Sequence, residues 1–184
     1  MTDTTLIIIA VVVVLAVLAV AWVYLSSRRR ERLRTRFGPE FDRTAHDVGS
    51  EKRAEAVLAE REKRVASYHI RELSAEERGR FSESWRRVQD MFVDDPASAV
   101  TEADMLVTDL MNTRGYPMSD FERRAEDLTV DHAGVVHHYR AAREIAVRHS
   151  RKSASTEDLR QALVHYRELF GELLGTSRPV RRTA

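Results

Sequence analysis

The feature that most constrains this chain is an unbroken run of 20 apolar residues near its start, residues 6–25. A helix of that length is about 30 Å long, which equals the thickness of the hydrocarbon core of a bilayer. In lipid the backbone must satisfy its own hydrogen bonds, so a single spanning segment has to be helical. Trp22 and Tyr24 stand at the end of the run, where amphipathic rings favour the membrane interface. The run therefore predicts a transmembrane helix.

A cleavable signal peptide is the competing interpretation, with Ala19-Val20-Ala21 as its cleavage site. Signal peptides carry a basic first region and an apolar stretch of about 7–15 residues. Here residues 1–5 contain no basic side chain, and the apolar stretch is longer. The sequence favours an uncleaved anchor.

The charges on either side of the run predict its orientation. The preceding flank contains one charged side chain, Asp3. Six arginines follow the run: Arg28, Arg29, Arg30, Arg32, Arg34 and Arg36. By the positive-inside rule, residues 1–5 lie outside and the rest of the chain lies in the cytoplasm. The arginines should also attract anionic lipid headgroups, at roughly 1 kcal/mol each. We therefore expect a single-pass inner-membrane protein with a membrane-proximal basic segment.

Beyond the membrane run, the pattern is helical throughout. No stretch shows sustained alternation of polar and apolar residues, and apolar positions recur at helical spacing. The helix of the apolar run should continue through the arginines until Gly38 and Pro39 break it after Phe37, and residues 40–49 are expected to be a connector. The further expected helices cover residues 50–68, 74–95, 96–115, a short segment from 119, then 131–149 and 156–174. The predicted fold is thus all-α. It comprises an external N-terminus (1–5), a transmembrane helix (6–25), a polybasic juxtamembrane segment and connector (26–49), a helical bundle (50–175) and a basic disordered tail (176–184).

Local signals place the helix ends. Ser74 with Glu77, and Ser119 with Glu122, match the capping-box pattern, and Asp95 before a proline matches an N-cap. The helix after Ser74 carries an apolar stripe that predicts a core around Trp85: Phe81, Trp85, Val88 and Phe92. By contrast, the stripe over residues 50–68 is thin and is interrupted at Arg61. That helix should pack at the edge of the core, or pair with a second copy as a coiled coil in a weak homodimer.

The charge is balanced overall but unevenly distributed. The net charge is +1, which gives no global reason to expect nucleic-acid binding. Residues 90–131 carry a local charge of −8, and residues 132–184 carry +5. Two interpretations stay open: the blocks pair with each other inside the bundle, or one of them docks an oppositely charged partner.

The residues that usually carry chemistry are sparse. The chain has no cysteine, which excludes disulfides, thiolate zinc sites and a cysteine nucleophile. Its seven histidines form no His-Glu-x-x-His motif, and its seven glycines form no phosphate-binding loop. No strand-turn-helix elbow is present to expose a serine. We therefore predict no catalytic residue, no cofactor and no metal site, and we expect a protein that is not an enzyme.

A set of residues in the middle of the chain resembles a known family. They are Phe81, Trp85, the element Phe92-Val93-Asp94-Asp95-Pro96, Ala103-Asp104, Leu106, and Met111 with Arg114-Gly115-Tyr116-Pro117-Met118-Ser119-Asp120-Phe121-Glu122. They are similar to a widespread uncharacterised bacterial family of small, helical, often membrane-anchored proteins, over roughly residues 31–150. The resemblance implies an all-helical fold and an inner-membrane setting. It implies no reaction, cofactor or catalytic residue.

The function that these observations favour is a protein-interaction or scaffolding module held at the membrane, with an unknown protein partner. If the bundle has a binding surface, we expect it around these residues: Trp85, Asp94, Asp95, Arg114 and Tyr116. The alternative is a membrane-tethered nucleic-acid-binding protein or an enzyme of unknown class. Residues 137–152 form a basic helix end, which is the feature that suggests nucleic-acid binding. The nearby acids would repel phosphate, which favours the first reading.

Overall fold

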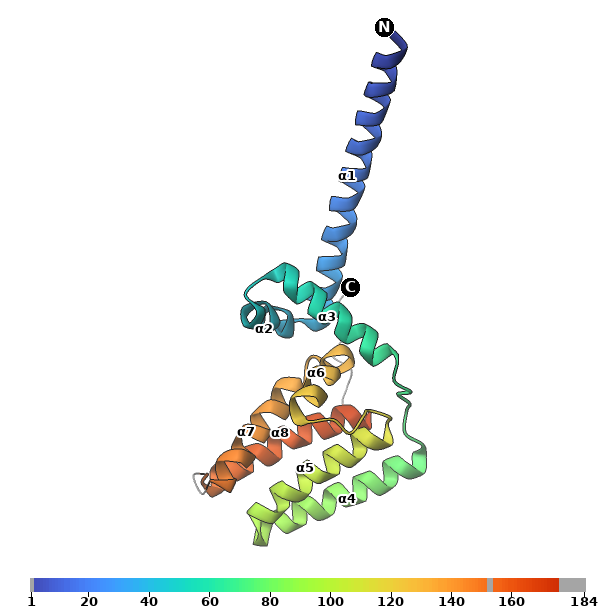
Figure 1. Ribbon diagram of the computed structural model, residues 1–184. Helices are drawn as coiled ribbons and strands as arrows, with labels where there is room; N and C mark the ends of the chain where they lie inside the picture. The colour runs from blue at the N-terminus through green and yellow to red at the C-terminus, as the bar shows by residue number, and fades with distance from the viewer. Residues whose placement is uncertain (1, 152–153, 176–184) are drawn as a thin grey trace. The chain divides into compact units, whose positions relative to one another are not determined.

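The computed structural model describes residues 2–151 and 154–175, and within them the chain forms eight α-helices and no strand (Figure 1). The predicted all-α fold is thus confirmed. The helices are α1 (Thr2–Phe37), α2 (Pro39–Val48), α3 (Glu51–Ala66), α4 (Ala75–Asp94), α5 (Pro96–Thr113), α6 (Phe121–His132), α7 (Val136–Ser150) and α8 (Thr156–Leu174). The predicted tail, residues 176–184, lies outside the described residues.

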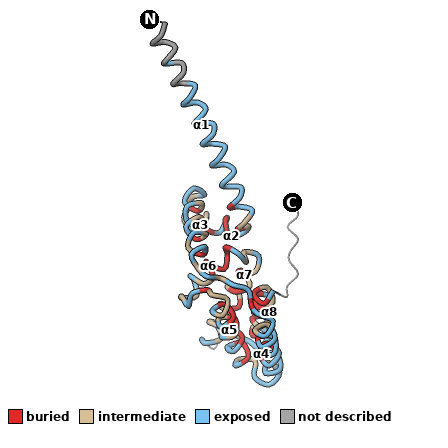
Figure 2. The backbone as a smooth tube through the Cα atoms, turned by 90° about the vertical axis from the view of Figure 1, so that its right-hand side faces the viewer, coloured by how far each residue is buried: buried red, intermediate tan, exposed pale blue. Residues whose placement is uncertain are grey.

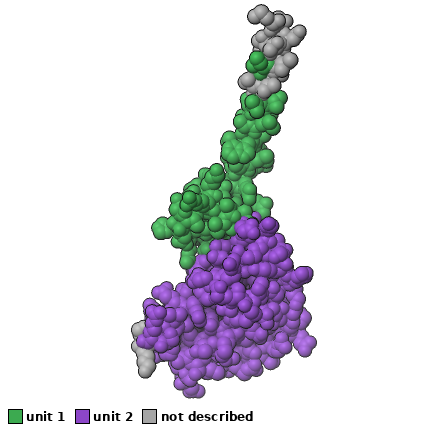
Figure 3. All heavy atoms as spheres, in the orientation of Figure 1, with its two compact units in different colours: residues 1–59 green, residues 60–184 purple. Residues whose placement is uncertain are grey.

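The chain divides into two compact units, residues 1–59 and residues 60–184 (Figure 3). The division falls inside α3, so the last two turns of that helix belong to the second unit.

The first unit begins with α1, a continuous helix that ends at Phe37, where the sequence predicted a break. Residues 13–32 of α1 are exposed, as the pale blue of Figure 2 shows. Among the described residues, no helix is both long and apolar enough to cross a membrane. Within the predicted span, the side chains of residues 6–7 and 9–12 lie outside the described ones.

The segment predicted as a connector, residues 40–49, is in fact the helix α2, so that expectation was wrong. Pro39 stands at the first helical position, where its missing N–H costs nothing. Phe41 and Thr44, three positions apart, share one face and are buried, so one face of this short helix is covered. The expectation failed because ten residues give a weak periodic signal.

The second unit is built on two helical hairpins. A capping box joins the Ser74 and Glu77 side chains to each other's main-chain N–H groups and starts α4, as predicted. Asp95 is the single residue between α4 and α5, and its carboxylate accepts a hydrogen bond from the N–H of Ser98. One linking residue forces the two helices to run antiparallel. The other hairpin consists of α7 and α8, and α5 packs against both of its helices.

Two expected boundaries in the middle of the chain were wrong. Ser119 does not cap a helix: Asp120 does, and its carboxylate accepts from the N–H of Arg123 at 2.9 Å. The helix expected over residues 131–149 starts only at Val136, because α6 continues to His132 and a short turn follows. The N-cap is the residue whose side chain can accept from the first free N–H groups of the helix, and here that residue is Asp120 and not Ser119.

The core of the second unit lies between the hairpins and under α6. Trp85 of α4 stacks on Phe170 of α8, with ring centroids 4.7 Å apart and planes 18° from parallel. The buried residues, red in Figure 2, gather along the inner faces of α5 and α8. The predicted core around Trp85 is therefore present, and its side chain faces Phe170.

A polar contact joins the acidic and basic blocks inside this unit. The carboxylate of Asp104 in α5 accepts from the hydroxyl of Tyr166 at 2.9 Å and from Arg143 at 3.4 Å. The negative charge of Asp104 and burial together raise the pKa of Tyr166, burial being the larger cause. At this point, then, the acidic and basic blocks pair with each other.

Candidate functional site

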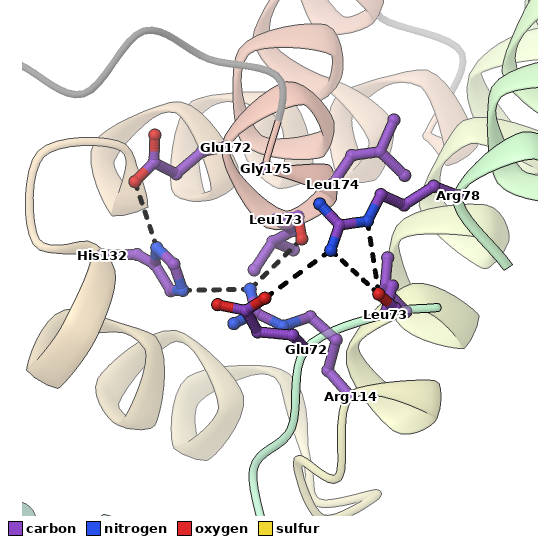
Figure 4. A pocket seen from close by; sticks show the side chains of 9 residues that line it. All are labelled: Glu72, Leu73, Arg78, Arg114, His132, Glu172, Leu173, Leu174 and Gly175. Carbon is purple, nitrogen blue, oxygen red and sulfur yellow. Dashed lines mark hydrogen bonds and ion pairs between the residues drawn. The ribbon is translucent and has the colours of Figure 1, made fainter. Parts of the chain in front are cut away.

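A pocket of about 290 Å³ opens at the end of the second unit, where α5 and α8 end and the segment before α4 passes by (Figure 4). Five polar side chains from distant parts of the sequence line it: Glu72, Arg78, Arg114, His132 and Glu172. Leu73, Leu174 and Gly175 add apolar surface and main chain. These residues are far apart in the sequence and meet only in the folded chain.

Arg114 is the centre of this cluster. Its Nη1 donates to the main-chain oxygen of Leu173 at 3.2 Å and lies 3.3 Å from Nε2 of His132. Its Nε donates to the main-chain oxygen of Arg71 at 3.4 Å, and the N–H of Arg71 donates back to the oxygen of Arg114. A guanidinium beside the last carbonyls of a helix is favourable, because those oxygens have no helical partner and carry the negative end of the helix dipole.

The contacts of His132 determine which of its nitrogens carries the proton. Arginine only donates hydrogen bonds, so Nε2 of His132 accepts from Arg114. The proton is then on Nδ1, which donates to a carboxylate oxygen of Glu172 at 3.2 Å. Burial lowers the pKa of His132, and the charge of Arg114 lowers it further, while Glu172 acts in the opposite direction. His132 is therefore neutral at pH 7.

Arg78 forms the rim of the pocket. Its Nε and Nη2 donate to the main-chain oxygen of Leu73 at 3.2 and 2.9 Å, and Glu72 pairs with it at 3.6 Å (Figure 4). Both guanidinium groups of the pocket thus already donate to main-chain oxygens. The clearest role of the cluster is to hold the end of α5, the end of α8 and the segment before α4 together.

The turn after α5 supports this arrangement. Gly115 adopts a φ of +96°, which L side chains rarely adopt, and a Cβ there would collide with the main-chain oxygen of His69. Tyr116 follows and is buried, and within the described chain its hydroxyl has no hydrogen-bond partner. Burial, and then the charge of Asp131, raises its pKa. The Arg-Gly-Tyr-Pro element is thus a tightly packed corner.

The structure does not bring the five predicted surface residues together. Trp85 and Tyr116 are in the core, with only 7% and 2% of their surface exposed. Asp94 and Asp95 are exposed at the turn between α4 and α5. Arg114 follows the other end of α5, about 27 Å away at 1.5 Å per residue. A single surface made of all five was therefore a wrong expectation, and Asp94, Asp95 and Arg114 are the three of them that are not buried.

Sequence reasoning missed a second polar cluster, between the end of α3 and α6. Asp127 is 1% exposed, and its carboxylate accepts from Arg64 Nε at 2.9 Å, from Arg64 Nη2 at 2.6 Å and from the hydroxyl of Tyr68 at 2.9 Å. Arg61 is also buried and donates to the hydroxyl of Thr129 at 3.0 Å. The one available signal was Arg61 itself, which occupies an apolar position in the stripe of α3.

Some of the six arginines that follow the apolar run have protein partners. Arg30 pairs with Glu51 at 3.1 Å and Glu55 at 2.7 Å, both in α3, and Arg34 pairs with Asp42 of α2 at 3.1 Å. The hydrogen bond to Asp42 raises the pKa of Arg34. The guanidinium of Arg28 lies 4.7 Å from the centre of the Tyr24 ring. These arginines therefore help to hold α2 and α3 against α1, a role that the sequence analysis did not foresee.

Among the described residues, no group of three or more His, Asp or Glu side chains is arranged to hold a metal ion. Comparison of the chain with protein-family models gives no match, and neither does comparison with curated proteins or with solved structures. The resemblance to a bacterial family of membrane-anchored helical proteins stays a prediction.

Proposed function

We propose that this protein is a single-pass membrane protein whose helical bundle works as a protein-interaction or scaffolding module on the cytoplasmic side. The observation that carries the proposal is the apolar run of residues 6–25 with six arginines directly after it. Because α1 continues without a break from Thr2 to Phe37, the run and the arginines belong to one helix. The described apolar side chains from Val13 to Leu25 are exposed, so they have no protein cover of their own.

The contact surface that fits this proposal best is the turn between α4 and α5. Val93 is 82% exposed there, beside the exposed carboxylate of Asp94. An apolar side chain flanked by charge is a common composition for a small docking surface. Asp95 caps α5 at this turn, and the hydrogen bonds that its carboxylate accepts from Ser98 lower its pKa.

The interaction module is favoured over the nucleic-acid alternative. Two arginines of α7 are paired with carboxylates within the protein: Arg143 with Asp104 at 3.4 Å and Arg148 with Asp158 at 3.1 Å. A phosphate backbone would have to compete with these carboxylates.

Membrane topology is tested with single cysteines, because the chain has none of its own. Thr4→Cys and Asp94→Cys variants are treated with a membrane-impermeant maleimide in intact spheroplasts and after lysis. We expect Thr4→Cys to be labelled in both conditions and Asp94→Cys only after lysis. Labelling of Asp94→Cys in intact spheroplasts would invert the topology, and recovery of the chain in the soluble fraction would refute the anchor.

The contact surface is tested by photo-crosslinking in living cells. A photoreactive amino acid replaces Val93 or, as a control, the exposed Glu144 of α7. We expect a discrete adduct from position 93 that is absent from position 144. An adduct of twice the chain mass identifies a homodimer. If position 93 gives no adduct or the same adducts as position 144, the turn is not the docking surface.

A further inference from the structure

Two histidines that lie 27 positions apart in the sequence meet on the α7–α8 hairpin. His138 is on α7 and His165 on α8, and these helices run side by side (Figure 1). Their Nδ1 atoms are 2.9 Å apart, and their ring centroids are 5.2 Å apart. The ring of His137 lies 3.9 Å from that of His138. The pair is only partly buried, so a small ion can reach it.

From this geometry we propose that His138 and His165 form a two-nitrogen binding site for a late first-row divalent metal ion, of the kind that prefers tetragonal coordination. The distance between the two nitrogens carries the argument. Metal–imidazole bonds are about 2.0–2.1 Å long. Two such ligands in neighbouring positions of a square or octahedron, 90° apart, are therefore about 2.9 Å from each other. Tetrahedral ligands would be about 3.3–3.4 Å apart.

The 2.9 Å separation is that of the hydrogen bond between the two rings, so the metal would take the place of the proton in that bond, and the spacing points to a class of metal. Copper(II) and nickel(II) prefer tetragonal arrangements of nitrogen and oxygen, and imidazole suits both ions. The hard cations magnesium and calcium prefer oxygen ligands and have nothing comparable here. The protein supplies two ligands, and water completes the coordination. Glu168, one helical turn after His165, adds negative charge close to His138.

The protonation states of the two rings suit metal binding. Burial, followed by the neighbouring histidines His137 and His165, lowers the pKa of His138, while Glu168 opposes the shift. Burial also lowers the pKa of His165. Both rings are thus neutral at pH 7, and one Nδ1 already presents its lone pair to the other. The donating ring needs only to move its proton from Nδ1 to Nε2, so binding at pH 7 releases no net proton.

The test uses the full-length chain without a polyhistidine tag, titrated with nickel(II) and separately with magnesium(II). We expect one saturable nickel site and no magnesium binding. Both His138→Gln and His165→Gln should weaken nickel binding by at least about tenfold, the smallest loss expected when even an outer-shell partner is removed. His46→Gln is the matched control, because that side chain is 92% exposed and lies on α2. Unchanged binding in the His138→Gln/His165→Gln double variant, or an equal loss in the control, would overturn the proposal.

A second measurement needs no variant. The electron paramagnetic resonance spectrum of the wild-type chain with one equivalent of copper(II) should show hyperfine structure from two imidazole nitrogens. A spectrum with one coordinated nitrogen would overturn the two-histidine site, whether or not the variants fold.

Discussion

The buried carboxylate of Asp127 provides the sharpest test of how the second unit holds together. It accepts three hydrogen bonds, two from Arg64 and one from Tyr68. Replacing Asp127 with alanine removes all three acceptor contacts and leaves the guanidinium of Arg64, 25% exposed, without its main partner. Breaking a buried ion pair in this way costs about 3–5 kcal/mol.

The lower end of that range applies here. Arg64 keeps a second carboxylate, Glu126, at 3.2 Å from its Nη2. We therefore expect Asp127→Ala to lower the free energy of unfolding by about 3 kcal/mol. Tyr68→Phe removes one hydrogen bond to a charged acceptor and should cost about 1.5 kcal/mol. Combined with Arg64→Met, Asp127→Ala should show a coupling energy of about 1–3 kcal/mol in a double-mutant cycle.

The assay is guanidinium chloride unfolding followed by tryptophan fluorescence. The chain has two tryptophans, so in a Trp22→Phe background the signal comes from Trp85, which is buried in the same unit. The reasoning is refuted if Asp127→Ala costs less than Tyr68→Phe, or if the cycle shows no coupling between Arg64 and Asp127.

Three further predictions follow from the structure. Trp85→Ala should lower the free energy of unfolding by about 3–5 kcal/mol, because it removes the ring that stacks on Phe170; an unchanged thermal midpoint would contradict its burial. Gly115→Ala should cost clearly more than Gly49→Ala in thermal unfolding. Both glycines have positive φ, a conformation that costs an L residue about 1–2 kcal/mol. Only at Gly115 would the added Cβ also collide with the main-chain oxygen of His69, so equal losses would refute the close contact. Stability should fall as the pH drops below about 6.5, because the pKa values of His132, His138 and His165 are lowered in the folded chain and the unfolded chain then binds more protons. Chemical denaturation between pH 7.5 and 5 measures this, and His138→Gln should flatten the dependence; a slope of the opposite sign would contradict the assigned shifts.

Features that depend on neighbouring residues could be predicted from the sequence. The end of α1 at Phe37, the capping box of α4, the Asp95 cap and the end of α8 before Gly175 are all where the pattern put them. Each has a local cause: a capping side chain starts α4 and α5, whereas Gly38 with Pro39 ends α1 and Gly175 ends α8, so a short window of sequence contains the signal. The same holds for the apolar run and the arginines after it, on which the proposed anchor and orientation rest.

The tertiary structure decided which residues meet. Arg114 was a candidate from the sequence, but His132 and Glu172 were not, and they lie 18 and 58 positions further on. Trp85 was a candidate for both the core and a binding surface, and packing places it, with Tyr116, in the core. Arg61 and Asp127 are charged and are nevertheless buried. A pattern of polarity assigns each residue to a face of its own helix. Whether another helix then covers that face, and with which partner, depends on packing between segments that are far apart in the chain.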